Sequence, residues 1–557
     1  MDVVKRRALE RGGAVSSHGR GRSWWSATAA EQVRCQNWQD CASHAGSRTP
    51  DALRGFPRPR HVPAQGIPCP VSRRLDAGRL RHCEVLMLVR QIFDPALAQY
   101  AYLIGCPRSG EAIVIDPERD IDRYYDVAER HKLRIVAAAD THIHADYLSG
   151  LREFAERGVR VYASDEGGPE WRYEWLLDSS YDYRLLKHND HFKVGNIEFV
   201  AVHTPGHTPE HLVYEVIDHG SGATEPVGVV TGDFVFVGDL GRPDLLENAA
   251  GHAGSMIPAA QQLYRSLARF RRLPEFTQVW PAHGAGSACG KSLGDVPSST
   301  VGYELRFNPA LRSATSETDF ISYILSGQPE PPFYFARMKR DNKVGPKVIG
   351  AVPGLPHLPS RELSALAGRS DVVVVDTRPR ADFIKGHLPK SLLAEWEFQF
   401  VNITGSYIEE GTPIYLIIEP SRVDEATRLL LRIGLDKLVG YFTPADFAAY
   451  AAGGGSVATL EAISMAEMEE RRVAGGVRVL DVRGKVDFDT AQVTGAQNIA
   501  HTRLLARLGE LPNDAPVLVH CASGARAVHA SAFLARHGYT PSTVADSFTR
   551  WQPAVSV

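Results

Sequence analysis

The sequence is poor in cysteine and has no long apolar run, and each absence excludes a class of protein. Only three of its seven cysteines, Cys106, Cys289 and Cys521, lie after residue 86. Three scattered cysteines do not form a disulfide framework, so the chain is not a small disulfide-stabilised domain and a reducing, cytoplasmic location is expected. No apolar run approaches the ~20 residues of a membrane-spanning helix, so no membrane partner is expected.

The part of the sequence that can fold also lacks an excess of positive charge. Residues 1–86 carry 15 Lys/Arg against 7 Asp/Glu, whereas the rest of the chain carries 47 against 58. An acidic globular part argues against nucleic acid as the main partner. With 557 residues and a guide of ~150 residues per domain, three or four domains are expected.

Residues 1–86 are rich in Arg, Ser, Gly and Pro and show no apolar periodicity. Three interpretations are open: a disordered basic tail, an organelle transit peptide, or upstream sequence translated from a start site placed too early. We favour the last, because alternating apolar residues begin directly at Met87. No function is assigned to this segment.

Between Met87 and Asn342, short apolar strands alternate with helices, and most strands end in ionisable side chains. In a sheet protein, the loops beyond the carboxyl ends of the strands build the active site. The strands concerned are predicted over 133–139, 197–202, 227–230 and 277–280. The ionisable residues that follow them are His142, His144, Asp146, His203, His207, Asp233 and His283.

These residue types predict a metal site. His142 and His144 stand two residues apart on an extended segment, where such side chains point the same way, so both imidazoles can face one cation. Two histidines and one carboxylate with open positions are typical of non-haem Fe(II), whereas three or four nitrogen or sulfur ligands favour zinc.

Four motifs, HxHAD, TPGHT, TGD and PAHG, occur in this order between His142 and Gly284. In this order and spacing they resemble the metallo-β-lactamase superfamily, over roughly residues 87–328. The resemblance implies an αββα sandwich, and we place this domain at 87–342. The alternative that these histidines are core residues and bind no metal explains the four ordered motifs much less well.

One departure from the superfamily pattern bears on the number of metals. Dinuclear hydrolases such as glyoxalase II read HxHxDH, whereas this sequence has Tyr147 at the last position. A phenol, with its reference pKa of ~10, is a poor ligand near neutral pH, so one metal per chain is expected. This pattern resembles the persulfide dioxygenases, which implies one Fe(II), with zinc as an alternative occupant after purification.

That resemblance also implies roles for the residues. His142, His207 and Asp233 would be the iron ligands. The residues that would lie next to them, orienting the ligands or bound oxygen or hydrogen bonding within the loop, are His144, Asp146, Tyr147 and His283.

Two further residues are candidates for binding the substrate. Arg242, in GDLGRPDL, would bind the carboxylate of a thiol substrate, or else it forms a structural pair with Asp244. Cys289 could accept a persulfide beside the iron, or it is a small buried cysteine. Glutathione-type enzymes carry a tyrosine where this sequence has Ala285, so glutathione, coenzyme A and another small thiol all stay open as the carrier.

The rest of the chain contains an internal repeat. After a linker at 343–359, VVVVDTRPRADFIKGHL (372–388) resembles VRVLDVRGKVDFDTAQV (477–493), with the aspartates and arginines at constant offset. The strand–helix–strand rhythm of each copy predicts two small parallel α/β domains, at 360–452 and 457–557.

The second copy carries a sulfur nucleophile. Cys521 follows the apolar strand 517–519 and precedes a helix, where backbone N–H groups stabilise a thiolate. CxxGxR in this context resembles the rhodanese active loop, which implies that Cys521 holds a persulfide and Arg526 binds the sulfur oxyanion. The first copy has Glu419 and Asp424 at the two positions, so we interpret it as an inactive spacer or docking domain.

The order of the three domains resembles the fused persulfide dioxygenase–sulfurtransferases of bacterial hydrogen sulfide detoxification. It implies oxidation of a thiol persulfide by O₂ to sulfite, and sulfur transfer at Cys521 that makes or uses thiosulfate. Two alternatives stay open: a glyoxalase II-like dinuclear thioester hydrolase fused to a rhodanese, and a sulfur-sensing scaffold without turnover. A homo-oligomeric assembly also stays open.

Overall fold

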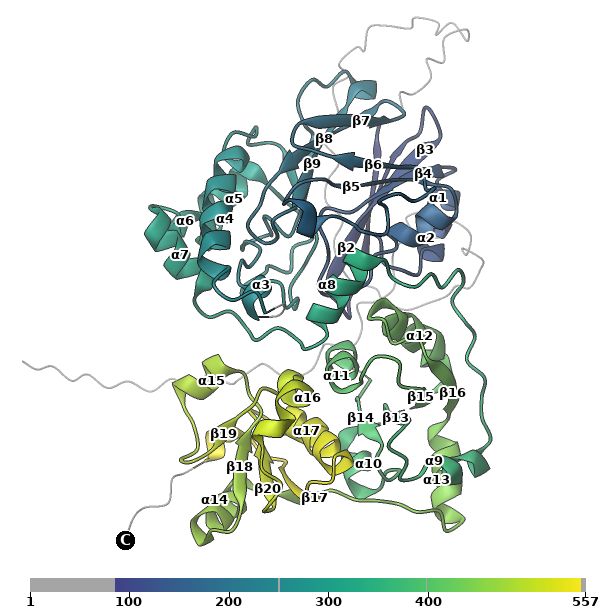
Figure 1. Ribbon diagram of the computed structural model, residues 1–557, viewed down its shortest axis with the longest axis vertical. Helices are drawn as coiled ribbons and strands as arrows, with labels where there is room; N and C mark the ends of the chain where they lie inside the picture. The colour runs from purple at the N-terminus through teal and green to yellow at the C-terminus, as the bar shows by residue number, and fades with distance from the viewer. Residues whose placement is uncertain (1–85, 249–250, 397, 552–557) are drawn as a thin grey trace, which may run out of the picture. The chain divides into compact units, whose positions relative to one another are not determined.

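Two six-stranded sheets lie face to face in the first half of the chain (Figure 1). The structure, a computed structural model, describes residues 86–248, 251–396 and 398–551. The basic segment predicted over 1–86 lies outside these residues except for Leu86, so its three interpretations stay open. Among the described residues, no helix is long and apolar enough to cross a membrane.

The first sheet is antiparallel at one edge and parallel at the other. In spatial order it comprises β1 (Leu88–Asp94), β2 (Gln99–Cys106), β3 (Glu111–Ile115), β4 (Arg134–Ala139), β5 (Arg160–Ser164) and β6 (Tyr183–Leu186). The pairs from β1 to β3 are antiparallel and those from β3 to β6 are parallel.

The second sheet is mostly antiparallel. From one edge to the other it comprises β7 (Asp190–Val194), β8 (Ile197–His203), β9 (Leu212–Asp218), β10 (Gly228–Gly232), β11 (Gln278–Pro281) and β12 (Ser299–Thr300). Only β10 and β11 pair in parallel. The ends of β4, β8 and β10 therefore carry the histidine and aspartate motifs.

Alternation along the strands builds two kinds of core. In β8, Phe199 and Ala201 pack between the sheets, whereas Val200 and Val202 pack under helices on the outer face. The helices are α1 (Asp122–Arg130) and α2 (Leu151–Glu156) on the first sheet, and α4 (Met256–Phe270), α5 (Val301–Phe307), α6 (Pro309–Ser313) and α7 (Glu317–Leu325) on the second. Successive side chains of a strand point to opposite faces of its sheet. One face of each sheet therefore packs against the other sheet, and the opposite face packs under helices. The predicted αββα sandwich is confirmed.

Two short helices complete this region. The first, α3 (Leu245–Asn248), follows the GDLGRPDL loop, and the second, α8 (Phe335–Val344), spans the domain boundary predicted at 342. The predicted linker is held against the sandwich, because Glu153 accepts hydrogen bonds from the backbone N–H groups of Ile349 and Gly350 at 2.6 and 3.1 Å.

Two small parallel sheets follow. The first has the order β14 (Leu392–Leu393), β13 (Val373–Asp376), β15 (Ile414–Ile417) and β16 (Leu438–Phe442). The second has the order β19 (Gln497–Asn498), β18 (Arg478–Asp481), β20 (Val517–His520), β21 (Pro541–Val544) and β17 (Glu461–Ile463). The four strands that the sheets share occur in the same order, which is the arrangement expected of a repeat. Ile417 pairs with Asp376 as His520 pairs with Asp481, so Ile418 stands at the position of Cys521, and the expectation of Glu419 there was wrong by one residue.

Helices surround both sheets. In the first repeat they are α9 (Leu363–Leu366), α10 (Arg380–Lys385), α11 (Phe400–Tyr407), α12 (Val423–Arg432) and α13 (Pro444–Ala452). In the second they are α14 (Met465–Ala474), α15 (Lys485–Thr490), α16 (Leu504–Arg507) and α17 (Ala525–Arg536).

The aspartate–arginine motif of each repeat has a structural role. Arg378 pairs with Asp376 through two nitrogens and donates to the carbonyl of Gly386 at 2.8 Å. Arg483 pairs with Asp481 in the same way and donates to the carbonyl of Ala491 at 2.6 Å. The motif thus ties the end of one strand to the loop after the next helix in both copies.

Candidate metal centre

Three ligand atoms from three strand ends converge at the rim of the sandwich. His142 follows β4, His207 lies in the loop between β8 and β9, and Asp233 follows β10 directly. Asp233 Oδ2 lies 3.3 Å from His207 Nε2 and 4.0 Å from His142 Nε2. Ligands at ~2.0–2.2 Å from one cation are spaced by about this much. Both carboxylate oxygens of Asp233 are buried without a hydrogen-bond partner, so the residues fit one divalent cation.

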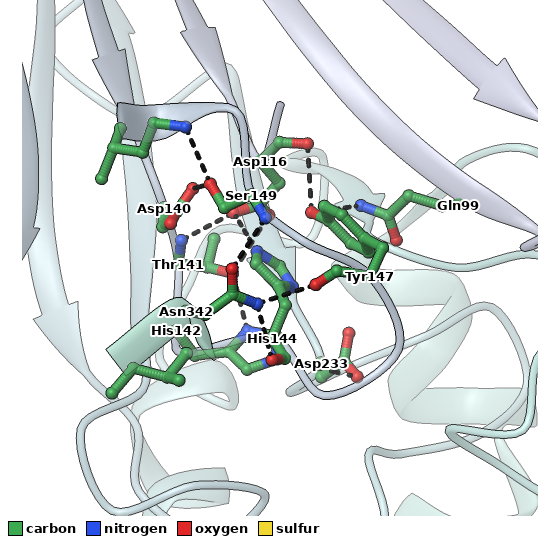
Figure 2. A network of polar contacts seen from close by, with 12 residues as sticks. Gln99, Asp116, Asp140, Thr141, His142, His144, Tyr147, Ser149, Asp233 and Asn342 are labelled. Carbon is green, nitrogen blue, oxygen red and sulfur yellow. Dashed lines mark hydrogen bonds and ion pairs between the residues drawn. The ribbon is translucent and has the colours of Figure 1, made fainter. Parts of the chain in front are cut away.

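Thr141 fixes the tautomer of His142 (Figure 2). Its hydroxyl lies 3.0 Å from Asp116 Oδ2, and because a carboxylate only accepts, the hydroxyl donates to it. The same hydroxyl oxygen lies 2.9 Å from His142 Nδ1 and therefore accepts the Nδ1 proton. His142 Nε2 then keeps its lone pair, which is the form that a metal ligand needs.

A backbone carbonyl sets the same tautomer in His207. His207 Nδ1 lies 3.0 Å from the carbonyl oxygen of Arg242, which can only accept, so Nδ1 carries the proton. Burial lowers the pKa of His207 to about 4 and lowers the pKa of His142 well below its ordinary value. Both imidazoles are therefore neutral near pH 7, as ligands to a cation must be.

A third histidine supports the carboxylate. The backbone N–H of Asp233 donates to His211 Nε2 at 3.0 Å, and His211 Nδ1 lies 2.9 Å from the hydroxyl of Thr204. Because Nε2 accepts, the His211 proton is on Nδ1. Burial by itself would raise the pKa of Asp233, but His283 and His207 hold it below its ordinary value. Asp233 is therefore an anion fixed in position by its own backbone.

A second cluster adjoins the first. The ligand atoms of Asp146, His283 and Cys289 lie within 4.8 Å of one another. His283 Nε2 lies 3.4 Å from both Asp146 Oδ2 and Asp233 Oδ1, so Asp233 presents one oxygen to each cluster. Burial lowers the pKa of His283, but Asp233 and its neighbours raise it well above the ordinary value. Burial raises the pKa of Cys289 to about 12, so this buried cysteine is a thiol.

The Tyr147 hydroxyl is fully hydrogen bonded (Figure 2). It donates to the carbonyl of Asp116 at 3.2 Å and accepts from Gln99 Nε2 at 3.0 Å. Burial raises the pKa of Tyr147 well above its ordinary value. With both hydrogen-bonding roles filled, the phenol is not available as a metal ligand.

His144 faces a separate carboxylate cluster. Its Nε2 lies 3.1 Å from Asp116 Oδ1, and its ligand atoms group with Asp116 and Asp140 rather than with Asp233. Burial lowers the pKa of His144, but Asp116, Asp140 and Asp146 outweigh burial and raise the pKa to about 9. Burial also raises the pKa of Asp140 to about 7.

Arg242 is buried and its guanidinium is paired. Nε and Nη2 lie 2.8 and 2.6 Å from the two oxygens of Asp244, and Nη1 donates to the carbonyl of Ala288 at 3.0 Å. This residue therefore ties its own loop to the loop of Cys289, and its carbonyl holds His207. Binding of a substrate carboxylate by Arg242 stays a prediction.

The second candidate site lies in the C-terminal repeat. Cys521 follows β20 and is buried, and Gly524, with φ +85°, turns the chain into α17. A side chain at Gly524 would lie 3.0 Å from the backbone of Ala545, so this tight turn requires glycine. Arg526, in the first turn of α17, lies 3.8 Å from Asp487.

A cavity of about 340 Å³ lies beside Arg526. Its wall includes Arg526 and His501 from the second repeat and Ser287 and Ala288 from the loop that carries Cys289. His501 Nδ1 is buried there without a hydrogen-bond partner. The cavity is therefore lined by Arg526 and by two residues just before Cys289, but its lining includes neither Cys521 nor a candidate metal ligand.

Four supporting residues escaped the sequence interpretation: Asp116, Thr141, His211 and Asn342. Asp116 had a signal, because it directly follows the apolar strand that precedes the HxHAD strand; in the structure its φ of +54° is unusual for a residue other than glycine. His211 also had one, four residues after His207. Asn342, whose side chain donates to the carbonyls of His144 and Tyr147 at 2.9 and 2.7 Å, had none.

Comparison with known proteins agrees with this geometry. The model of the metallo-beta-lactamase superfamily matches residues 94–283, and that of the rhodanese-like domain matches residues 464–554. The solved structure of a metallo-beta-lactamase from Staphylococcus aureus subsp. aureus COL is 38% identical, with a TM-score of 0.58, and the match covers 65% of this chain and 100% of that chain. The chain belongs to the metallo-beta-lactamase superfamily. More particularly, it is a member in which residues 464–554 match a rhodanese-like domain.

Two relatives with assigned activities match parts of the chain. Persulfide dioxygenase ETHE1, mitochondrial, of Bos taurus is 27% identical over 235 residues, which cover 42% of this chain and 78% of that protein. Hydroxyacylglutathione hydrolase of Tolumonas auensis is 27% identical over 347 residues, which cover 60% of this chain and 99% of that protein.

Proposed function

We propose that the chain is a mononuclear Fe(II) persulfide dioxygenase coupled to a Cys521 sulfurtransferase. The observation that carries the proposal is the set of His142, His207 and Asp233, in which both imidazoles have their Nε2 lone pairs free and both oxygens of a buried carboxylate accept no hydrogen bond from the described residues. When bound, iron(II) would supply open coordination positions and the electrons needed to activate O₂. We place the protein in the cytoplasm.

The reaction that we assign to the first site balances as RSSH + O₂ + H₂O → RSH + SO₃²⁻ + 2 H⁺. The terminal sulfur loses four electrons and O₂ gains four. In this reaction His207 and His142 stay neutral, because their protonated Nδ1 atoms are bound to Arg242 and Thr141. Burial of the whole set excludes bulk water from a reactive persulfide.

At the second site, Cys521 would carry the sulfane sulfur. Sulfite attacks the outer sulfur of the Cys521 persulfide, the S–S bond breaks, and thiosulfate leaves with the Cys521 thiolate restored. Arg526, in the wall of the cavity beside α17, would provide the positive charge for the oxyanion. Because one chain carries both sites, the sulfite made at one is at a high effective concentration at the other.

Oxygen uptake tests the first activity. Iron-loaded protein is given glutathione persulfide and, separately, coenzyme A persulfide, and O₂ consumption and sulfite are measured. We expect uptake with at least one carrier and equal amounts of sulfite and O₂. Asp233→Asn serves as the control without iron. Absence of uptake together with rapid cleavage of a glutathione thioester would overturn the assignment.

One observation favours a second candidate, a dinuclear thioester hydrolase. Asp146, His283 and Cys289 form a second possible ligand set that shares Asp233 with the first. A hydroxyacylglutathione hydrolase is among the relatives. This candidate requires two metals per chain and thioester cleavage, so metal analysis of the purified protein separates it from the first proposal.

A further inference from the structure

The first rhodanese-like repeat, which lacks a sulfur nucleophile, contacts the loop that carries His142. The backbone N–H of Leu148 donates to the carbonyl of Arg432, the last residue of α12, across 2.7 Å. The apolar side chains that share one buried cluster at this contact are Ala145, Tyr147, Leu148, Leu430 and Ile433. The HxHAD loop is therefore packed against the first repeat as well as against its own domain.

The side chain of Arg432 reaches into the sandwich. Its Nη1 lies 2.6 Å from Asp94 Oδ2, its Nε and Nη2 lie 2.8 and 2.7 Å from the two oxygens of Asp120, and Nε lies 3.3 Å from Glu118. All four residues are buried. A planar guanidinium can bind several carboxylates at once, and a buried charge pair of this kind is costly to break.

Two of the three carboxylates that bind Arg432, those of Glu118 and Asp120, lie on the segment that positions the metal loop. Asp116 accepts from the backbone N–H of Thr141 at 2.7 Å, and the carbonyl of Pro117 accepts from the N–H of Gly150 at 2.8 Å. Glu118 and Asp120 follow directly. Arg432 thus holds the metal loop by its carbonyl and the segment beneath the loop by its side chain.

We propose that the first repeat is a positioning domain for the metal centre and that Arg432 is its positioning residue. The inference rests on the proposed metal site at His142, His207 and Asp233. This role does not need a nucleophile, because the residues of α12 and Ile433 act through packing and charge. Arg119 reinforces the contact by pairing with Asp436 at 2.6 Å and donating to the carbonyl of Leu431 at 3.1 Å.

Metal affinity tests the proposal without relying on turnover. Zn²⁺ affinity of the full chain is measured by competition with a chromophoric chelator, and the visible spectrum of the Co²⁺-loaded protein reports ligand geometry. For Arg432→Met we expect affinity to fall by roughly 10-fold or more, the effect typical of losing a group that orients ligands. The Co²⁺ spectrum should change as well, and the amide of Leu148 should exchange its hydrogen faster.

Two further variants test whether the loss of Zn²⁺ affinity is specific to the Arg432 guanidinium. Arg432→Lys keeps one charge but not the fork, so an intermediate loss is expected; this variant also keeps the test usable if Arg432→Met does not fold. Arg536→Met removes a guanidinium that joins the two repeats through the carbonyls of Lys390, Ser370 and Val372, and it should leave Zn²⁺ affinity unchanged. Sulfur transfer at Cys521 in the Arg432 variants reports that the chain is folded.

The outcomes separate the two proposals. If the wild-type chain does not bind Zn²⁺ or Co²⁺ stoichiometrically, the metal site itself is refuted. If it does bind, and Arg432→Met binds equally well with an unchanged spectrum, the positioning role is refuted and the metal site stands. Equal losses in Arg432→Met and Arg536→Met would also refute the positioning role, because general loosening of the repeats would then explain both.

Discussion

Thr141→Val removes the hydroxyl that sets the tautomer of His142 and leaves the side-chain volume unchanged. In the wild-type chain this hydroxyl accepts the Nδ1 proton at 2.9 Å and passes a hydrogen bond to Asp116 at 3.0 Å. In the variant, the Nδ1–H group is buried without an acceptor, which costs about 1–3 kcal/mol. The imidazole escapes this cost by moving its proton to Nε2, the atom that must bind the cation.

To bind the metal, the variant must move the His142 proton from Nε2 back to Nδ1, and this move costs free energy. A cost of about 1.4–2.7 kcal/mol corresponds to a loss of about 10- to 100-fold in affinity, which is the range seen when a group that orients a metal-binding histidine is removed. The assay is Zn²⁺ affinity by chelator competition at pH 7.5, with iron content after anaerobic loading as a second measurement. Cys521-dependent sulfur transfer in the same samples reports the folded fraction.

Thr277→Val is the matched control. Its hydroxyl is also buried and donates to a backbone carbonyl, that of Pro226, at 3.2 Å, but it touches no candidate ligand. We expect Thr277→Val to lose stability without losing Zn²⁺ affinity. An unchanged affinity in Thr141→Val, or an equal loss in both variants, would show that the hydroxyl does not set the tautomer.

Three further predictions follow from the geometry. Cys521→Ser should abolish sulfur transfer between thiosulfate and cyanide while leaving the iron content and O₂ uptake intact, and a loss of uptake would mean that the two sites are not separate. Asp233→Asn should reduce bound iron to well below one per chain, since the cation loses the carboxylate that lies within 4.0 Å of both imidazoles; full occupancy by metal analysis would exclude Asp233 as a ligand. In the metal-free protein, the pKa of His144 is raised to about 9 and that of Asp140 to about 7, so each of these two groups contributes stability that is lost as pH rises, Asp140 between about pH 4 and 7 and His144 between about pH 6.5 and 9. His144→Gln should flatten the curve of stability against pH above about pH 6.5 in urea unfolding, and an unchanged slope would contradict the assignment.

Local patterns together with the family resemblance were sufficient to predict the αββα sandwich. Apolar runs located the strands, the rule that active groups follow strand ends gathered a larger set that includes His142, His207 and Asp233, and the resemblance selected these three as ligands. The rule works because parallel and neighbouring strands bring their ends to one rim of a sheet. The repeat was also visible, since Asp376 and Asp481 form the same pair with the arginine two residues later in both copies.

Contacts between distant segments were not predictable from these patterns. The sequence shows Arg432 only as a basic residue in the last turn of an amphipathic helix, which is a common position for arginine. Its partners Asp94, Glu118 and Asp120 lie about 300 residues earlier in the chain. No periodicity or motif links such residues, because their pairing depends on how one folded domain packs on another.

The sequence by itself therefore determined which side chains stand at the strand ends, since strand periodicity and motif spacing are local properties of the chain. The tertiary structure decided which nitrogen of each imidazole is free, where the Tyr147 hydroxyl points, and that the first repeat packs against the loop that carries His142. These features depend on hydrogen-bond partners such as Thr141, Gln99 and Arg432, and only packing in three dimensions brings those partners within reach.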